Sequence, residues 1–404
     1  MSEGYFRNEH QFIYYQNDKV TPYSAVSYGY KAANISEDSK ERDALFEKRQ
    51  MDISESCEKF NYSIASNVLL IDKIHSIYYC PIPKVGSTFW KRSLEVLTSQ
   101  GKIKSPFDLT LNDIKLLSKS KHLSTRELED LTEQGTSFMF VRNPYARLFS
   151  AYENKIYCPN LMFWKSTGSR IVKLVRSSRD HVHSKYGFDV TFYEFIKYIL
   201  YQNERGKTIN GHFRPMINIC NPCQTHFDYI GKLETFADDA KFIITKWKSK
   251  FDDINITFGE KERTIDTVKG HLRFLYQAKR IVNTIKIPFT KLMLRTWRDL
   301  QIRGLLSKSI AFPFNASDSG EITKTDYLNA VLEALEIPVN HTEVKLQRHE
   351  ALVQAYRQVP MADMEKLRTY LLKDCLIFNY EDRPKDLFDR SVPLNDTFLY
   401  IDGL

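Results

Sequence analysis

The sequence predicts an α/β fold in which a central parallel sheet is flanked by helices, with helical additions in the C-terminal half. Two short apolar runs, residues 76–80 and 137–141, have the composition of buried strands. Each run is followed by a loop and then by a sequence that favours a helix. This repeated order of strand, loop and helix is typical of sheets whose strands run parallel.

The loop after the first strand, Pro83-Lys84-Val85-Gly86-Ser87-Thr88, has the composition of an anion site. Gly86 lets the backbone approach a ligand closely, and the free N–H groups of the following helix favour negative charge. Lys84 adds a mobile cation, while Ser87 and Thr88 add hydroxyl donors. Because the lysine precedes the glycine, the loop is not of the nucleoside-triphosphatase type. Taken alone, the loop fits an ordinary strand–helix turn with a solvated lysine equally well.

The second strand ends in Arg142-Asn143-Pro144. Asn143 is a favourable N-cap and Pro144 a favourable first helical residue, so a helix is expected to begin there. Arg142 then lies at the carboxyl end of a strand, where open α/β sheets bind ligands. Arg142 and Ser150, two turns into the helix, could hold a second phosphate together. Taken alone, however, this motif favours the alternative, in which Arg142 pairs with a carboxylate and Ser150 is a neutral helix residue.

Together, these two elements resemble the sulfotransferases that use 3′-phosphoadenosine 5′-phosphosulfate (PAPS). The resemblance assigns the loop residues Lys84, Val85, Gly86, Ser87 and Thr88 to the 5′-phosphosulfate, and Arg142 and Ser150 to the 3′-phosphate. It implies a P-loop-like three-layer fold, PAPS as the donor and no metal. Two residues depart from the family pattern, which usually has an acidic residue at Asn143 and often has Asn at Phe89.

A third stretch narrows the resemblance to a subfamily. It comprises His212-Phe213-Arg214-Pro215, Cys220-Asn221-Pro222-Cys223 and residues 227–235. This stretch resembles a region of the Golgi carbohydrate sulfotransferases, which include the chondroitin and dermatan 4-O-sulfotransferases and the HNK-1 sulfotransferase. Residues 370–380 are similar to the closing segment of that group. The resemblance implies a carbohydrate O-sulfotransferase in the Golgi, acting on a glycosaminoglycan such as chondroitin or dermatan.

Two residues are predicted to be catalytic. Lys84 would neutralise charge on the leaving oxygen, and His212 would accept the proton of the acceptor hydroxyl, since imidazole titrates near neutral pH. Alternatively, His212 is a structural residue, and His181 or His183 takes the role of the base. The substrate-binding candidates are Arg214, Lys91 and Arg92.

The formal net charge is +8, which suits an acidic partner. Solvated helix faces account for most of the basic residues, and an acidic glycan explains the remainder better than nucleic acid does. Residues 255–325 are expected to form a basic helical insertion. There, Lys291, Arg295 and Arg298 are spaced to lie on one helix face, which suits a polyanion groove.

The expected organisation is an irregular N-terminal tail or stem over residues 1–37, followed by one sulfotransferase domain over 38–390. The N-terminus has no apolar signal region, and no run approaches the length of a membrane span. The family usually has an N-terminal membrane anchor, so either the anchor is missing from this sequence or this member is soluble. The sequence contains no indication of oligomeric state.

The six cysteines allow three disulfides without requiring any. For Cys220 and Cys223 we favour a local disulfide, ahead of reduced structural thiols and half of a metal site. Six N-glycosylation sequons favour a secretory history; they begin at Asn34, Asn61, Asn255, Asn315, Asn340 and Asn395.

Two other classes of function remain open. A nucleotide kinase or hydrolase would need a Walker-type lysine or a pair of aspartates for Mg²⁺, and neither stands out. A non-catalytic polyanion-binding protein on a sulfotransferase fold would be marked by the loss of Lys84, Arg142 or Ser150, and all three are present.

Overall fold

The structure is a computed structural model, and it describes residues 35–59, 68–99, 101–115, 121–122, 135–177, 180–315, 322–391, 393–394 and 398–401. Most of the expected N-terminal tail, residues 1–34, lies outside this set, as do the sequons at Asn34, Asn61 and Asn395. The last three residues of the expected tail instead begin helix α1 (Ile35–Glu58). No helix within the described residues is both long enough and apolar enough to cross a membrane.

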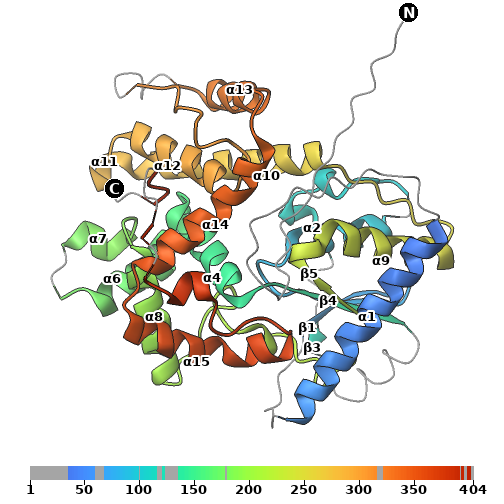
Figure 1. The fold of residues 1–404 in the computed structure, drawn as a ribbon. Helices are drawn as coiled ribbons and strands as arrows, with labels where there is room; N and C mark the ends of the chain where they lie inside the picture. Colours follow the sequence, from blue (N-terminus) through green and yellow to red (C-terminus); the bar gives the residue numbers. More distant parts are fainter. Residues whose placement is uncertain are drawn as a thin grey trace, which may run out of the picture.

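The described strands form one sheet in the order β3-β1-β2-β4-β5 (Figure 1). Strands β2 (Ile77–Cys80), β4 (Thr136–Val141) and β5 (Tyr229–Lys232) run parallel. Strands β1 (Val68–Asp72) and β3 (Lys121–His122) are antiparallel additions at one edge. The central part of the sheet is therefore parallel, as expected, and the sequence did not predict the antiparallel edge. A short turn joins β1 to β2, and a short turn permits only antiparallel pairing.

The carboxyl ends of the three parallel strands lie next to one another, on the same side of the sheet. Cys80 pairs in register with Met139, and Val141 pairs with Lys232. The loops that follow β2 and β4 therefore leave the sheet side by side. Both predicted anion motifs lie in these loops.

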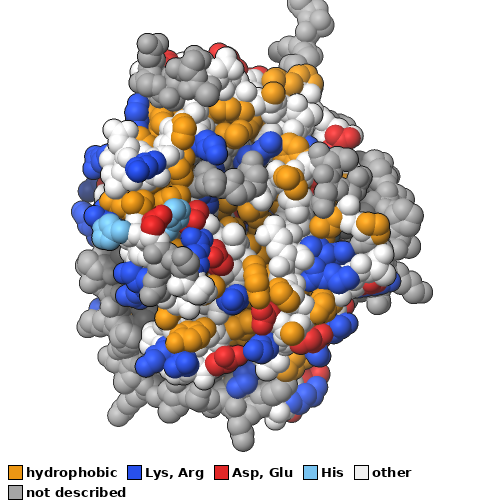
Figure 2. Space-filling model, turned by 90° about the vertical axis from the view of Figure 1, so that its left-hand side faces the viewer, with side chains coloured by type: hydrophobic (Ala, Val, Ile, Leu, Met, Phe, Trp, Pro, Cys, Tyr) orange, Lys and Arg blue, Asp and Glu red, His pale blue; other side chains and the backbone are white. Residues whose placement is uncertain are grey.

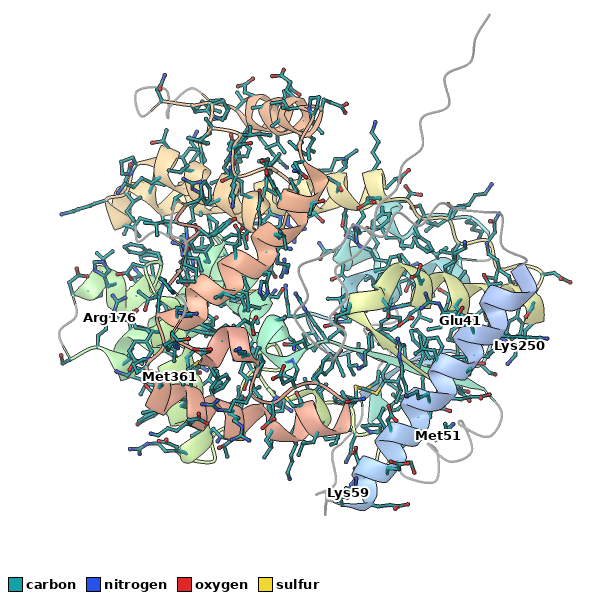
Figure 3. The ribbon with its side chains drawn as sticks, in the orientation of Figure 1. Glu41, Met51, Lys59, Arg176, Lys250 and Met361 are labelled. Atoms are coloured by element: carbon teal, nitrogen blue, oxygen red, sulfur yellow. A yellow bond between two sulfur atoms is a disulfide. The ribbon has the colours of Figure 1, made fainter. Side chains whose placement is uncertain are left out.

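Helices α2 (Ser87–Thr98), α9 (Phe236–Lys250) and α1 cover the sheet half of the molecule. Figure 3 marks the length of α1 by Glu41, Met51 and Lys59. Arg49 of α1 donates to Asp239 of α9 at 2.7 Å, which fixes the two helices together. The core between sheet and helices is aromatic, with the Trp90 ring 4.7 Å from Phe138 and 5.7 Å from Trp247 between centroids.

The remaining helices gather beside the sheet half (Figure 1). The α-helices are α4 (Pro144–Tyr152), α5 (Leu161–Phe163), α6 (Ser169–Val175), α7 (His181–Tyr186), α8 (Phe192–Glu204), α10 (Glu260–Ala278), α11 (Val282–Ile285), α12 (Phe289–Ile302), α13 (Lys324–Leu335), α14 (His341–Arg357), α15 (Met361–Ile377) and α16 (Lys385–Phe388). The π-helical turns are η4 (Glu153–Tyr157) and η5 (Trp164–Gly168). The 3-10 turns are η1 (Pro106–Asp108), η2 (Leu111–Asp113), η6 (Met216–Asn218), η7 (Leu233–Thr235) and η8 (Lys279–Ile281).

The expected polyanion groove on residues 291–298 is not formed. Arg295 is 5% exposed and donates to the carbonyl of Phe188 at 2.7 Å. The guanidinium of Arg298 lies 4.0 Å from the centroid of the Phe398 ring. The prediction failed because α12 is buried on several sides, so its arginines satisfy internal groups. On the face seen in Figure 2, Lys and Arg side chains are interspersed with acidic and hydrophobic ones.

Two disulfides connect distant segments, Cys57 with Cys223 and Cys80 with Cys220. The favoured local disulfide between Cys220 and Cys223 was therefore wrong. Cys220 is bonded to the last residue of β2 and Cys223 is bonded to α1, so the loop that holds them is attached to both elements. Cys158 and Cys375 are buried free thiols.

Candidate active site

The loop from Pro83 to Thr88 has a conformation that requires glycine at one position. Gly86 is the N-cap of α2 and has φ of 86°, a backbone angle that other residues rarely adopt. A Cβ atom on Gly86 would lie 2.5 Å from the Phe236 ring. The helix therefore begins at Ser87, with its free N–H groups at the loop, as the predicted anion site requires.

Lys84 lies in the same loop and is itself held at a positive φ of 73°. Such a conformation is unfavourable for lysine and is typical of functional sites. The side chain is half-buried. Burial, reinforced by the positive charge of Arg303, lowers the pKa of Lys84 well below its usual range. A buried ammonium group near other cations is suited to bind an anion.

The second motif, Arg142-Asn143-Pro144, begins helix α4 as predicted. The side chain of Asn143 accepts a hydrogen bond from the backbone of Ala146 at 3.0 Å, and Pro144 is the first residue of α4. Arg142 is 8% exposed, and its Nη1 donates to the carbonyl of Lys84 at 3.4 Å. The structure thus brings the two predicted phosphate motifs into contact. Ser150 lies further along α4 and is 3% exposed.

His212 lies in the segment before η6, half-buried beside Phe163. The Oδ1 atom of Asn210 accepts hydrogen bonds from the backbone N–H of His212 at 3.0 Å and from its ring Nδ1 at 2.8 Å. This pairing places the ring proton on Nδ1, so Nε2 keeps a lone pair. Burial and the positive charges of Lys155 and Lys84 lower the pKa of His212 to about 3. The imidazole is therefore neutral in the ligand-free protein.

Residues 67–268, half of the chain, match the family model of the sulfotransferase family. The chain belongs to the sulfotransferase family. Carbohydrate sulfotransferase 11 of Rattus norvegicus is 33% identical over 181 residues, which cover 44% of this chain and 51% of the relative. Carbohydrate sulfotransferase 9 of Homo sapiens is 28% identical over 258 residues, covering 60% and 57% respectively.

A third relative, carbohydrate sulfotransferase 14 of Danio rerio, is 34% identical over 181 residues, which cover 44% of this chain and 47% of the relative. The chain thus spans about half the length of the curated relatives that it matches. No solved structure matches the sulfotransferase-family chain.

Arg147 connects the donor loop to the His212 segment, and the sequence pattern did not identify it. It is 2% exposed and lies in α4 between Arg142 and Ser150. Its guanidinium donates to the carbonyls of Pro83 at 3.0 Å, Arg214 at 2.7 Å and Gly211 at 3.0 Å. A charged residue within an otherwise apolar helix face was the only available signal.

The His212 segment is also fixed from the other side by α15. The carboxylate of Asp374 accepts the backbone N–H groups of Met216 at 2.6 Å and Ile217 at 2.9 Å. The Tyr370 hydroxyl donates to the carbonyl of Phe213 at 3.0 Å. The closing segment of the family pattern, far along the chain, therefore supports the loop that contains His212.

The substrate-binding candidates have different placements. Arg92 is 8% exposed and forms a 2.7 Å ion pair with Asp266 of α10, so the structure does not place it toward an acceptor. Arg214 is half-buried and donates from Nε to the carbonyl of Ile209 at 3.3 Å. Lys91 is half-buried, and burial lowers its pKa.

Lys155 is a further residue that the sequence pattern did not identify. It lies in η4, the π-helical turn that continues α4 directly beyond Ser150. Burial, together with the charges of Arg303 and Lys91, lowers the pKa of Lys155 to about 8. Lys84, Lys91 and Lys155 form no ion pair with another described residue. Glu153, two residues before Lys155, is bound by Arg303 at 2.9 Å and Arg348 at 3.1 Å.

A buried polar cluster lies behind this site. Among the described residues, Cys158, His271 and Asp299 are close enough together to share a metal ion. His271 pairs with Asp299 at 2.5 Å, and Arg303 lies 3.4 Å from the same carboxylate. Because Arg303 already supplies a positive charge here, we interpret the cluster as an ion-pair network that attaches α10 and α12 to η4.

Proposed function

We propose that the protein transfers the sulfonate group of PAPS to a hydroxyl of a glycan, with residues 38–390 acting as one catalytic domain. The main support is the contact between Arg142 and the carbonyl of Lys84, which joins the two expected phosphate motifs at one edge of the sheet. Membership of the sulfotransferase family supports the same reaction. The names of the matched relatives favour a carbohydrate acceptor.

On the donor side, Lys84, Gly86, Ser87 and Thr88 would bind the 5′-phosphosulfate through the lysine, the N–H groups of α2 and the two hydroxyls. Arg142 and Ser150 would bind the 3′-phosphate. Charge develops on the oxygen between phosphorus and sulfur as their bond breaks. The ammonium group of Lys84, which lies half-buried in this loop, would stabilise that charge.

On the acceptor side, His212 would take the proton of the attacking hydroxyl at Nε2. With a pKa of about 3 the free imidazole is a weak base. A bound donor brings several negative charges close to Lys84 and Lys155, which cancels much of the field that lowers this pKa. The pKa of His212 would therefore rise only when the donor is bound. His212 would then be an effective base only in the complex that contains the donor, which suits a reaction that needs both substrates.

For the acceptor we propose an acidic glycan, with chondroitin or dermatan as the first candidates and Arg214 as the contact to an acidic sugar. The excess of Lys and Arg over Asp and Glu supports a polyanionic partner. The sequons, together with the resemblance to the Golgi carbohydrate sulfotransferases, favour a Golgi location. The attached sulfate would increase the negative charge of the product.

Calorimetry with adenosine 3′,5′-bisphosphate and with ATP·Mg²⁺ tests the donor. We expect micromolar binding of the bisphosphate and binding of ATP·Mg²⁺ that is weaker by about tenfold or more, equivalent to about 1.4 kcal/mol. A preference for ATP·Mg²⁺ would instead support a kinase or hydrolase. Transfer of labelled sulfate from PAPS to a panel of desulfated glycosaminoglycans then identifies the acceptor, and binding without transfer would support a non-catalytic protein.

The His212→Gln variant tests the base. We expect transfer to fall by about 10²-fold or more while the bisphosphate still binds, since removing a general base costs about this much. His181→Gln, whose imidazole is exposed on helix α7, is the matched control and should keep full activity. Full activity in His212→Gln would remove this residue as the base.

A further inference from the structure

Lys155 stands in an unusual turn of the backbone. Residues Glu153–Tyr157 form a π-helix that follows α4 without a break. Such turns are rare and often lie at functional sites, because they redirect side chains that a regular helix would point elsewhere. Here the turn begins three residues after Ser150, so it directly follows the helix assigned to the donor phosphate.

The side chain of Lys155 lies beside the proposed base. Its Nζ atom is 4.8 Å from the centroid of the Phe163 ring. The same ring meets the imidazole of His212 edge-on, at 5.3 Å between centroids. The ammonium group of Lys155 and the imidazole of His212 thus pack against the same phenyl ring.

The charge of Lys155 acts on both sides of the proposed reaction. It contributes to the lowered pKa of Lys84 in the donor loop, and it is the largest charge effect on His212 in the acceptor segment. Its charge therefore acts on both Lys84, which would neutralise the leaving oxygen, and His212, which would accept the proton of the attacking hydroxyl. Gathering Lys84, Lys91 and Lys155 without a bound acid is unfavourable in the free protein and becomes favourable when an anion binds.

We propose that Lys155 is a further catalytic residue, whose ammonium group binds the non-bridging oxygens of the sulfonate as it moves from donor to acceptor; this rests on the function proposed above. In that step a bond forms between sulfur and the acceptor oxygen, and the bond between sulfur and the bridging phosphate oxygen breaks. The electron pair stays on adenosine 3′,5′-bisphosphate. The hydroxyl proton goes to Nε2 of His212, and Lys155 keeps its own protons throughout.

The chain offers a matched control for Lys155. Lys165 also lies in a π-helical turn, η5, and its Nζ is 5.7 Å from the centroid of the Tyr186 ring. Unlike Lys155 it is exposed. Replacing Lys165 by Met therefore removes a comparable cation–aromatic contact without touching the proposed site.

The test compares Lys155→Met, Lys155→Arg and Lys165→Met with the unaltered chain in labelled transfer from PAPS. We expect kcat to fall about 10²- to 10³-fold in Lys155→Met, the effect of removing one fixed electrostatic contact to a transition state. Affinity for adenosine 3′,5′-bisphosphate, which lacks the sulfonate, should change by less than about threefold. Lys155→Arg should recover part of kcat, and Lys165→Met should keep all of it.

Proton uptake gives a readout that a purely structural role would not produce. Near pH 8 Lys155 is about half-protonated, and a bound anion should complete its protonation. Calorimetry of bisphosphate binding in buffers of different ionisation enthalpy should show uptake larger by roughly half a proton in the unaltered chain than in either Lys155 variant. The Lys165→Met protein should match the unaltered chain.

The outcomes separate this proposal from the proposed function. Full kcat in Lys155→Met, with an active unaltered chain, would overturn the role of Lys155 alone. Equal losses of kcat, bisphosphate affinity and thermal stability in that variant would also overturn it, since the residue would then be structural. An unaltered chain that neither binds the bisphosphate nor transfers sulfate would overturn both.

Discussion

The buried guanidinium of Arg147 donates a 3.0 Å hydrogen bond to the carbonyl of Pro83, the residue before the lysine of the donor loop. Its other nitrogens donate to the carbonyls of Gly211 and Arg214, on either side of His212. One side chain therefore fixes the distance between the donor loop and the proposed base. Because all three of these bonds go to main-chain carbonyls, Arg147 acts through the backbone of the two loops.

Replacing Arg147 by Lys should destabilise the protein by about 2–4 kcal/mol, because an ammonium group cannot reach three carbonyls in one plane. We expect kcat to fall even at temperatures where the variant is fully folded, since the two loops would lose their common anchor. Denaturant unfolding and transfer kinetics measure the two effects. A folded variant of unchanged stability and kcat would show that the anchor is dispensable.

Replacing Gly86 by Ala tests the geometry of the donor loop. The new Cβ would meet the Phe236 ring in addition to the strain of a positive φ, so we expect a loss of about 2–4 kcal/mol and weaker bisphosphate binding. Gly101 has a similar φ of 79°, and among the described residues no atom lies within 4 Å of the position that its Cβ would take, so Gly101→Ala isolates the backbone strain. That control should cost only about 1 kcal/mol and should not affect binding.

Non-reducing peptide mapping should recover Cys57 linked to Cys223 and Cys80 linked to Cys220. The two bonds close loops of 166 and 140 residues, so each is expected to stabilise the fold by about 3–5 kcal/mol. Reduction should lower the midpoint of thermal unfolding accordingly. A peptide containing a Cys220–Cys223 bond would contradict the structure.

Asp374 predicts a specific dependence of stability on pH. Burial raises its pKa to about 6, above the ordinary value of 3.8. The folded state then binds the proton more tightly than the unfolded state, so this stabilisation is complete below pH 3.8 and is lost as the pH rises through about 6. The Asp374→Asn variant should lack this component.

The free energies of unfolding of the Asp374→Asn and unaltered proteins should therefore diverge between about pH 4 and pH 7. The change in their difference is expected to be about 2–3 kcal/mol, from about two pKa units at about 1.4 kcal/mol each. Parallel curves across this range would mean that Asp374 titrates normally.

Local sequence rules were sufficient for the elements around the site. The strand before Pro83, the glycine at the start of α2 and the Asn143–Pro144 helix start each depend on residues within one turn of one another, and all were predicted. The partners of Cys220 and Cys223 depend on segments that meet only after folding. No local pattern specifies such pairings.

The missed residues have the same explanation. Arg147 and Lys155 look like ordinary helical cations in the sequence. Their importance appears only in the folded protein, where Arg147 binds two loops that are distant in the chain and Lys155 lies against the ring that contacts His212. Conversely, the spacing of Lys291, Arg295 and Arg298 suggested a basic, exposed helix face that would bind a polyanion. Spacing gives the relative direction of side chains on a helix but not whether that helix is covered.

The central claim is that Lys84 neutralises the leaving oxygen of PAPS during sulfate transfer. The most direct measurement is transfer of labelled sulfate from PAPS to desulfated chondroitin or dermatan by the unaltered chain, by Lys84→Ala and by Lys73→Ala, whose lysine is exposed in the turn between β1 and β2. We predict that Lys84→Ala loses about 10³-fold or more in kcat and that Lys73→Ala keeps full activity. Undiminished transfer by Lys84→Ala would contradict the claim.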